Sequence, residues 1–136
     1  MDKLLDIEIV SPEKSVFKGT GKVLTVPGVE GRFQVLNMHA AMISMFEAGI
    51  ISIEDEKGEK INFSTRGGVA EVKNNKITVL ADAAEAKEDI DVERAQRSMD
   101  RANDRLKEGG NDIDRERAKF SLVRAQIRLK VAGVLK

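Results

Sequence analysis

The fold depends most on residues 90–110, which read IDVERAQRSMDRANDRLKEGG. Apolar side chains recur in this stretch at alternating spacings of three and four residues, so they share one face of an α-helix. They are Val92, Ala95, Met99, Ala102 and Leu106. Two glycines, Gly109 and Gly110, come soon after the last of them and end the helix. We therefore expect one amphipathic helix from about residue 90 to these glycines.

A second helix is expected after the glycines, from near Ile113 to about Val131. Its apolar residues form a series spaced seven apart, with alanines and leucines beside it: Ile113, Phe120, Ile127 and Val134, and then Ala118, Leu122, Ala125, Leu129 and Ala132. Because the connection is short, the two helices are expected to fold back as an antiparallel hairpin with its hinge at Gly109 and Gly110. The alanine-rich stripe of the first helix buries little area, so the hairpin needs a surface to lie on and is a candidate moving part.

Upstream of the helices, apolar and polar residues alternate, first at residues 5–9 and again at 22–26. A period of two is typical of a strand with one buried face. Further strands are expected at residues 33–36, 42–46, 49–53, 60–64, 69–72 and 76–80. About eight to ten short strands at close spacing predict an antiparallel β-sandwich or a flattened barrel. The predicted fold is α+β, with an N-terminal β-sandwich at residues 1–86 and a C-terminal helical hairpin at residues 87–136.

Turn residues separate the predicted strands. Gly58 suits a tight hairpin at residues 54–58, and two asparagines at 73–76 tolerate the left-handed conformation that a short turn requires. The glycines at residues 28–31 and 66–68 also indicate hairpin turns. Four phenylalanines are expected to join Ile, Val and Leu in the core: Phe17, Phe33, Phe46 and Phe63. Met38, Met42 and Met45 are interpreted as soft core residues rather than as an interface.

Composition excludes several classes of function. The chain has 23 basic and 23 acidic residues, so it lacks the positive charge of a nucleic-acid binder. It has no cysteine, which excludes disulfides and thiolate chemistry. Because it has only one histidine, His39, we expect no metal site. No apolar run approaches the ~20 residues that span a bilayer, and the first residues lack the order of a signal peptide. We expect a soluble, cytoplasmic protein.

The two predicted helices begin with nearly the same sequence. Residues 89–95 read DIDVERA and residues 112–118 read DIDRERA, so they match at six of seven positions. One interpretation is structural: the aspartates cap the free amides of a first turn, and the isoleucine begins a buried stripe. The other is functional: Asp91 and Arg94 share a helical face and hold a polar ligand such as phosphate, with Arg124 and Arg128 adding positive charge. The residues alone leave both open.

No catalytic site emerges from the other motifs. The glycine pairs at residues 28–31 and 66–68 lack the lysine and the helix that a phosphate-binding loop needs. His39 has no serine, cysteine or second histidine at motif spacing, so a structural or contact role is expected for it.

Four segments, taken in order, resemble the epsilon subunits of bacterial F-type ATP synthases. They are GRFQVLNMHA at residues 31–40, RGGVAEV at 66–72, TVLADAA at 78–84 and IDVERA at 90–95. Each segment is weak alone, but their common order along the whole chain is specific.

This resemblance implies a non-catalytic rotor subunit. Its β-sandwich is expected to bind the gamma subunit and the polar loops of the c-subunit ring, and so to help couple ion-driven rotation to ATP synthesis. Its hairpin is expected to rise along gamma toward the catalytic alpha and beta subunits and to inhibit ATP hydrolysis. The subunit would lie peripherally on the cytoplasmic face of the cell membrane, touching the membrane only through the complex.

The resemblance also implies that ATP is a regulatory ligand, with no cofactor required. The family's ATP motif, Ile/Leu-Asp-x-x-Arg-Ala, matches Ile90, Asp91, Arg94 and Ala95. Three further positions match those of ATP-binding members: Glu85, Arg124 and Arg128.

The expected docking residues come from the family's loop pattern Gly-Glu-Leu/Phe-Gly-x-Leu-Pro-Gly-His. Gly31, Phe33, Leu36 and His39 match it, whereas Arg32 stands where the family has an acid. Gln34 replaces a glycine, and Asn37 and Met38 replace Pro-Gly. The charge that Arg32 meets on the ring therefore does not carry over from the family.

Two alternatives belong to other classes of function. A free-standing nucleotide-sensing adaptor of the same fold would not co-purify with gamma and a membrane ring. A hydrolase that used His39 with an acidic residue would show turnover by the isolated chain.

Overall fold

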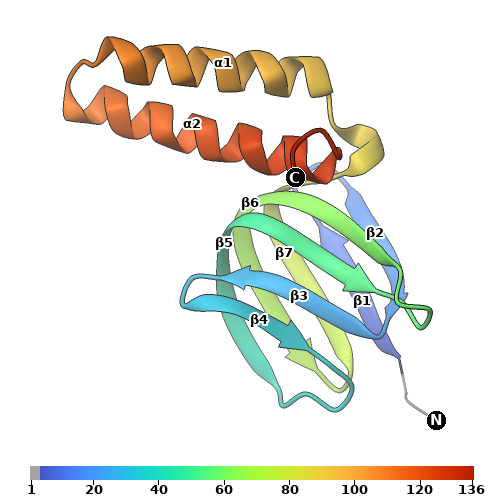
Figure 1. Cartoon of the computed structure of the whole chain (residues 1–136). Helices are drawn as coiled ribbons and strands as arrows, with labels where there is room; N and C mark the ends of the chain where they lie inside the picture. The colour runs from blue at the N-terminus through green and yellow to red at the C-terminus, as the bar shows by residue number, and fades with distance from the viewer. Residues whose placement is uncertain (1–3) are drawn as a thin grey trace. The chain divides into compact units, whose positions relative to one another are not determined.

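The computed structural model describes residues 4–136, and these residues divide into two compact units with the boundary between Ala86 and Lys87 (Figure 1). The first unit is made of strands and the second of helices, and each is described by itself.

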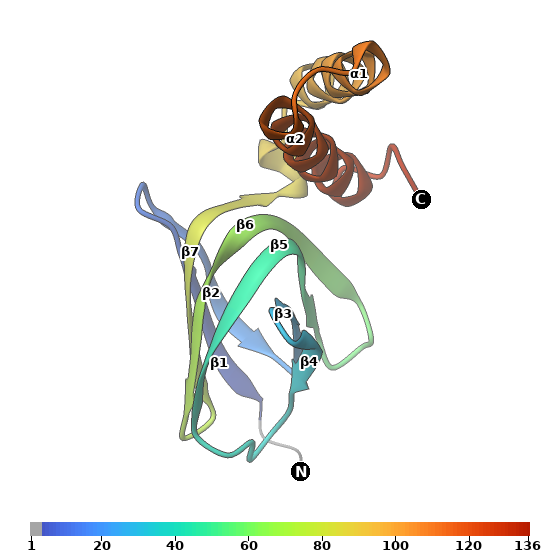
Figure 2. The same ribbon diagram turned by 90° about the vertical axis from the view of Figure 1, so that its left-hand side faces the viewer.

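Seven strands in the described part of the first unit form one continuous hydrogen-bonded sheet, in the order β2-β1-β7-β6-β5-β3-β4. Their bounds are β1 Leu5–Val10, β2 Ser15–Gly21, β3 Val23–Gly28, β4 Gly31–Val35, β5 Met42–Glu54, β6 Lys60–Lys73 and β7 Lys76–Ala86. The sheet curves over, so that β3 and β4 lie across the interior from β7 and β6 (Figure 2). The predicted β-sandwich is confirmed. One pairing departs from the antiparallel expectation, because β1 runs parallel to β7.

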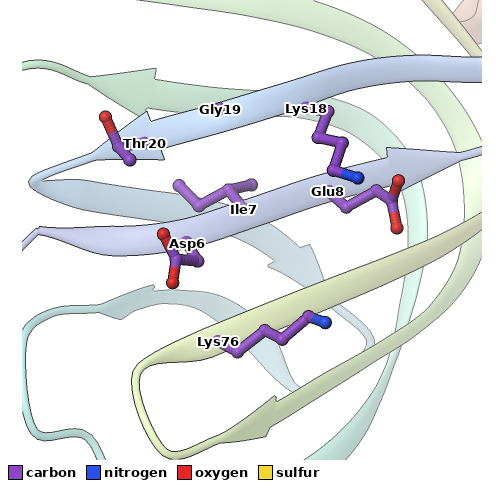
Figure 3. Close-up of a pocket in the computed structure, with 7 residues that line it drawn as sticks. All are labelled: Asp6, Ile7, Glu8, Lys18, Gly19, Thr20 and Lys76. Carbon is purple, nitrogen blue, oxygen red and sulfur yellow. The ribbon is translucent and has the colours of Figure 1, made fainter.

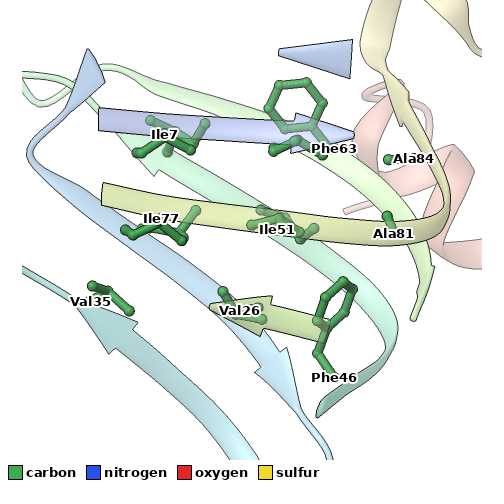
Figure 4. Packing of buried hydrophobic residues seen from close by; sticks show 14 of the residues in the cluster. Ile7, Val26, Val35, Phe46, Ile51, Phe63, Ile77, Ala81 and Ala84 are labelled. Atoms are coloured by element: carbon green, nitrogen blue, oxygen red, sulfur yellow. The ribbon is translucent and has the colours of Figure 1, made fainter. Parts of the chain in front are cut away.

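The core fills the space between the two layers of the sheet (Figure 4). It follows the predicted alternation: Leu5, Ile7 and Ile9 of β1 point inward and are at most 2% exposed. Phe46 and Phe63 are buried, while Phe17 and Phe33 are half-buried and pack against the same cluster. The rings of Phe17 and Phe63 meet edge to face with centroids 5.8 Å apart. All four predicted phenylalanines therefore contribute to the core.

Fewer and longer strands are present than the sequence predicts. The predicted strands at 42–46 and 49–53 are parts of β5, and those at 60–64 and 69–72 are parts of β6. The predicted turn at residues 66–68 is wrong, because Gly67 and Gly68 lie inside β6 where its pairing with β7 shifts register. These glycines bend the strand rather than end it. Strand β2 was not predicted, since its glycines interrupt the alternation.

The other predicted turns are confirmed. Asn74 and Asn75 connect β6 to β7 with positive φ angles of 52° and 61°. Gly58 has a φ of 84° in the β5–β6 connection, where the backbone N–H of Asp55 donates to Glu59 O. Gly28 and Gly31 face each other at the β3–β4 turn.

The second unit is a pair of antiparallel helices that follow a short 3₁₀ turn, Lys87–Asp89. Helix α1 spans Val92–Glu108 and helix α2 spans Asp112–Val131, with Gly109 and Gly110 between them (Figure 1). The predicted hairpin is confirmed. No helix within residues 4–136 is both long enough and apolar enough to cross a bilayer.

Alanines dominate the buried positions of the hairpin. Ala95 and Ala102 of α1 and Ala118 and Ala125 of α2 are at most 2% exposed, and each pair is spaced seven apart. Side chains this small let two helix backbones approach closely but remove little apolar area from water. Leu129 at the end of α2 is the largest fully buried side chain among the described residues of the unit.

The two similar sequences, residues 89–95 and 112–118, lie at different positions relative to the N-cap residues of their helices. Asp91 caps α1, with its Oδ1 accepting from Arg94 N at 3.1 Å, so Ile90 precedes the helix and is 8% exposed. In α2 the cap is Asn111, one residue before Asp112, and its Oδ1 accepts from Asp114 N at 2.8 Å. Ile113 consequently lies inside the first turn and is 66% exposed. The expectation that Ile113 begins a buried stripe is wrong.

Candidate docking surfaces and nucleotide site

An apolar row crosses the outer face of the sheet. The strand register places Met45 of β5 beside Val69 of β6, Val69 beside Leu80 of β7, and Leu80 beside Val10 of β1. Met45 is 63% exposed and Leu80 is 54% exposed, and the two valines are half-buried. We call these four residues the apolar row.

The residues next to the apolar row include one exposed apolar side chain and two polar ones. Ile43, two residues before Met45 on β5, faces the same side and is 74% exposed. It is followed across the sheet by the polar residues Glu71 and Thr78. A partly exposed apolar strip with polar side chains beside it is typical of a protein-docking surface.

The interpretation of the methionines as core residues holds only for Met42. Met42 is half-buried against the core, whereas Met38 is 83% exposed and Met45 belongs to the apolar row. Residues 42–46, MISMF, are almost all apolar, so their pattern does not show which side faces inward. The burial of Phe46 decides it, because alternate residues of a strand point to opposite faces.

The predicted docking residues fall at the two ends of β4 rather than in one loop. Gly31 and Arg32 begin β4 at the β3–β4 turn, where Arg32 is exposed. Phe33 follows them and packs half-buried against the core. Leu36 and His39 lie beyond the other end of the strand; Leu36 is 47% exposed and His39 is half-buried, with its Nδ1 2.7 Å from Ala40 O. At about 3.3 Å per residue, the two groups are separated by the length of the strand.

The predicted ATP residues belong to both units. Glu85 lies near the end of β7 in the first unit, and the others lie on the hairpin. The first turn of α1 and the last turns of α2 lie at the same end of the hairpin, so Arg94 and Arg128 come from adjoining helix ends (Figure 1). Arg94 and Arg124 are exposed, and Arg128 is half-buried.

The structural interpretation of Asp91 and Ala95 has direct support. Asp91 caps α1, and Ala95 is fully buried between the helices. Arg124 Nη2 lies 3.5 Å from Ser121 Oγ on its own helix. These contacts explain two of the motif residues by helix geometry and leave the guanidinium groups of Arg94 and Arg124 on the surface, where they are accessible to an anion.

One open depression of about 360 Å³ lies on β1, β2 and the start of β7 (Figure 3). Asp6 and Glu8 line it together with Lys18 and Lys76. The two charge signs balance, so it favours neither an anion nor a cation, and it contains no predicted site residue. Among the described residues no three His, Cys, Asp or Glu side chains are grouped so that they could hold a metal ion.

Two family models match the chain and together cover nearly all of it. The model described as "ATP synthase, Delta/Epsilon chain, beta-sandwich domain" matches residues 4–87. The model described as "ATP synthase, Delta/Epsilon chain, long alpha-helix domain" matches residues 88–133. The chain belongs to the ATP synthase delta/epsilon family.

Relatives with this family's name are close in sequence. The ATP synthase epsilon chain of Carboxydothermus hydrogenoformans is 47% identical over 103 residues, which are 75% of this chain and 75% of the relative. That of Salinibacter ruber is 40% identical over 113 residues, 77% of this chain and 76% of the relative. The resemblance to epsilon subunits is thereby confirmed.

Solved structures share the fold of this delta/epsilon chain. A chain in the mitochondrial ATP synthase of Euglena gracilis, described as OSCP/F1/c-ring, superposes with a TM-score of 0.78 at 19% identity, over 97% of this chain and 88% of that one. A chain in the central stalk and c-ring of the Tetrahymena thermophila enzyme superposes with a TM-score of 0.60 at 15% identity. At these identities the likeness shows the fold alone.

Family membership identifies the chain as a non-catalytic subunit of an ATP synthase, of the epsilon type. The expectation that it is not an enzyme is therefore confirmed by its family.

Proposed function

We propose that this chain acts in the rotor of an F-type ATP synthase and helps couple ion-driven rotation to ATP synthesis. In this proposal its β-sandwich joins the gamma subunit to the c-subunit ring at the cytoplasmic face of the membrane. The observation that carries the proposal is the apolar row on a chain of the delta/epsilon family.

The apolar row suits a helical partner such as gamma. Strands lie about 4.8 Å apart, so a row across four of them is about 14 Å long, and an α-helix is about 10–12 Å wide. Covering Met45 and Leu80 would remove their exposed apolar surface from water, which is worth about 1.5–3 kcal/mol for each large side chain that becomes fully buried. The predicted docking residues at the ends of β4 add polar contacts to gamma and to the ring.

The docking proposal is tested with the full chain as bait in a pull-down from detergent-solubilised membranes. We expect gamma and ring subunits to co-purify, and Leu80→Asp to reduce their recovery at least tenfold. Thr20→Asp, an exposed strand position outside the apolar row, is the matched control and should bind normally. Recovery of the bait alone would support the free-standing adaptor instead.

We further propose that the hairpin regulates the enzyme. Its small buried side chains make the closed hairpin easy to separate, and the arginines on both helices suit acidic surfaces on the catalytic subunits. In this proposal ATP binds the folded hairpin through Arg94, Arg124 and Arg128. ATP at ninefold above its Kd would stabilise that form by about 1.4 kcal/mol, enough to shift a balanced equilibrium tenfold.

Inhibition is tested by reconstituting the ATP synthase with the full chain or with a chain that stops after Lys87. The shortened chain should give faster ATP hydrolysis, with the largest difference at low ATP. Equal rates at every ATP concentration would contradict inhibition by the hairpin while leaving the coupling role of the sandwich in place.

A further inference from the structure

A strained turn lies between β4 and β5. Residues Leu36 to His39 form a β-turn closed by a hydrogen bond from His39 N to Leu36 O at 3.1 Å. Met38 occupies the third position with a φ of 65°, a left-handed conformation that glycine adopts freely and a residue with a Cβ adopts at a cost. Its side chain is 83% exposed, so burial of Met38 does not offset this cost.

One side chain from a distant turn holds both central residues of this turn. Asn75 Oδ1 accepts a hydrogen bond from Met38 N at 2.6 Å, and Asn75 Nδ2 donates to Asn37 Oδ1 at 2.7 Å. Asn75 lies in the β6–β7 connection, and its own carbonyl oxygen accepts from Asp6 N of β1 at 2.9 Å. The turn at residues 36–39 is therefore tied to the sheet rather than free.

The turn lies just before β5, the strand that carries Met45 of the proposed docking surface. Met38 is followed five residues later by Ile43 and then by Met45, and all three side chains are exposed. A partner that covers the apolar row along β5 reaches this turn next. Strained backbone that persists beside an exposed apolar side chain is a feature of binding sites rather than of ordinary loops.

We propose that Asn75 is a positioning residue that holds the 36–39 turn in the conformation in which Met38 contacts the gamma subunit. The proposal rests on the docking function proposed above. Asn75 does not itself touch the partner; it sets the place of the residues that do.

The test compares the full chain with Asn75→Gly, which removes the side-chain amide while keeping the positive φ of 61° accessible. The first readout is the NMR order parameter of the Met38 amide in the free chain. It should fall from about 0.85 to below about 0.6. Asn74→Gly, with a φ of 52° in the same connection, is the matched control and should leave this value unchanged. An unchanged order parameter in Asn75→Gly would overturn the proposal.

The second readout is affinity for the gamma subunit. Asn75→Gly should weaken binding by about tenfold, whereas in a Met38→Gly background the same substitution should have almost no further effect, because glycine needs no support in the left-handed conformation. Equal affinity of the full chain and Asn75→Gly would overturn the positioning role. If the full chain itself failed to bind gamma, the proposed docking function would be wrong, and so would the role of Asn75 in docking. The order parameter of Met38 would still decide whether Asn75 holds the turn.

Discussion

Two glycines with unusual backbone conformations allow β6 to pass close to its neighbouring strands. Gly67 and Gly68 have φ angles of 127° and 155° where β6 passes between β5 and β7. A Cβ at Gly68 would collide with the carbonyl oxygen of Leu80, and one at Gly67 would lie 2.9 Å from that of Phe46. These glycines are required by close approach of backbones, which is a property of the assembled sheet.

Gly68→Ala is expected to destabilise the sandwich by more than about 2 kcal/mol, because it adds a backbone collision to an unfavourable φ. Urea unfolding followed by circular dichroism measures the change. Gly31→Ala is the matched control: its φ is 129°, but a Cβ there meets no atom within 4 Å, so only about 1 kcal/mol should be lost. Equal effects of the two substitutions would refute the collision argument.

Arg94→Ala is expected to weaken ATP binding by the isolated chain by about ten- to a hundredfold, since a hydrogen bond to a charged group is worth about 1.5–3 kcal/mol. Titration calorimetry measures it. Arg97→Ala is the control, because the Arg97 guanidinium already lies 4.0 Å from Glu93 on the same helix. No heat at millimolar ATP, or equal binding by wild type and Arg94→Ala, would leave Asp91 and its neighbours with the capping role alone.

At the scale of elements, the hairpin and the sheet follow different packing rules. The sheet buries large side chains such as Phe63 and Ile51, while the helices meet mainly through alanines. The exposed side of α2 carries Ile113, Phe120 and Val123 at 66%, 65% and 45% exposure. The helical unit therefore has both an interface that buries little apolar area and apolar surface left over, as expected of an element that changes partners.

Ala102→Leu is expected to force α1 and α2 apart and to destabilise the hairpin by about 1–3 kcal/mol, because three extra carbons enter a filled space. Thermal loss of helical circular dichroism should begin at a lower temperature, while the β-sheet signals stay unchanged. Arg101→Leu puts the same side chain on the exposed position before it and should have little effect. A hairpin of unchanged stability in Ala102→Leu would contradict close helix packing.

At the scale of the whole molecule, the β-sandwich has a large apolar core of its own, whereas the helical hairpin buries mainly small side chains. The core cluster consists entirely of residues up to Ala86, and most buried residues of the two helices are alanines. This division agrees with the proposal of a fixed docking unit and a movable regulatory unit in one stalk subunit.

A chain that ends at Lys87 is expected to fold by itself, because it retains every strand and the whole core cluster. Cooperative thermal unfolding and dispersed amide signals in NMR would confirm it. A molten or aggregated fragment would show that the sandwich depends on the hairpin.

The sequence by itself determined the element types and much of the fold. Spacing of apolar residues separates strand from helix, since it depends only on local geometry, and so the change near residue 90 and the stop at Gly109 were predictable. The hairpin turn at Asn74 and Asn75 was predictable for the same reason. The order of the resembling segments indicated the family, because the order of motifs along a chain can be read without knowing how the chain packs.

Only the tertiary structure decided which strands are continuous and which face of β5 is exposed. It also decided where the similar sequences at residues 89–95 and 112–118 lie relative to the N-caps of their helices. Gly67 and Gly68 look like a turn in sequence and are a bend in β6, because the approach of β5 and β7 comes from residues far along the chain. Met45 joins Leu80 on the outer face for the same reason, and Asn75 reaches Met38 across the fold. Pairing between distant segments depends on register, and register is set by the packing of the whole sheet rather than by local spacing.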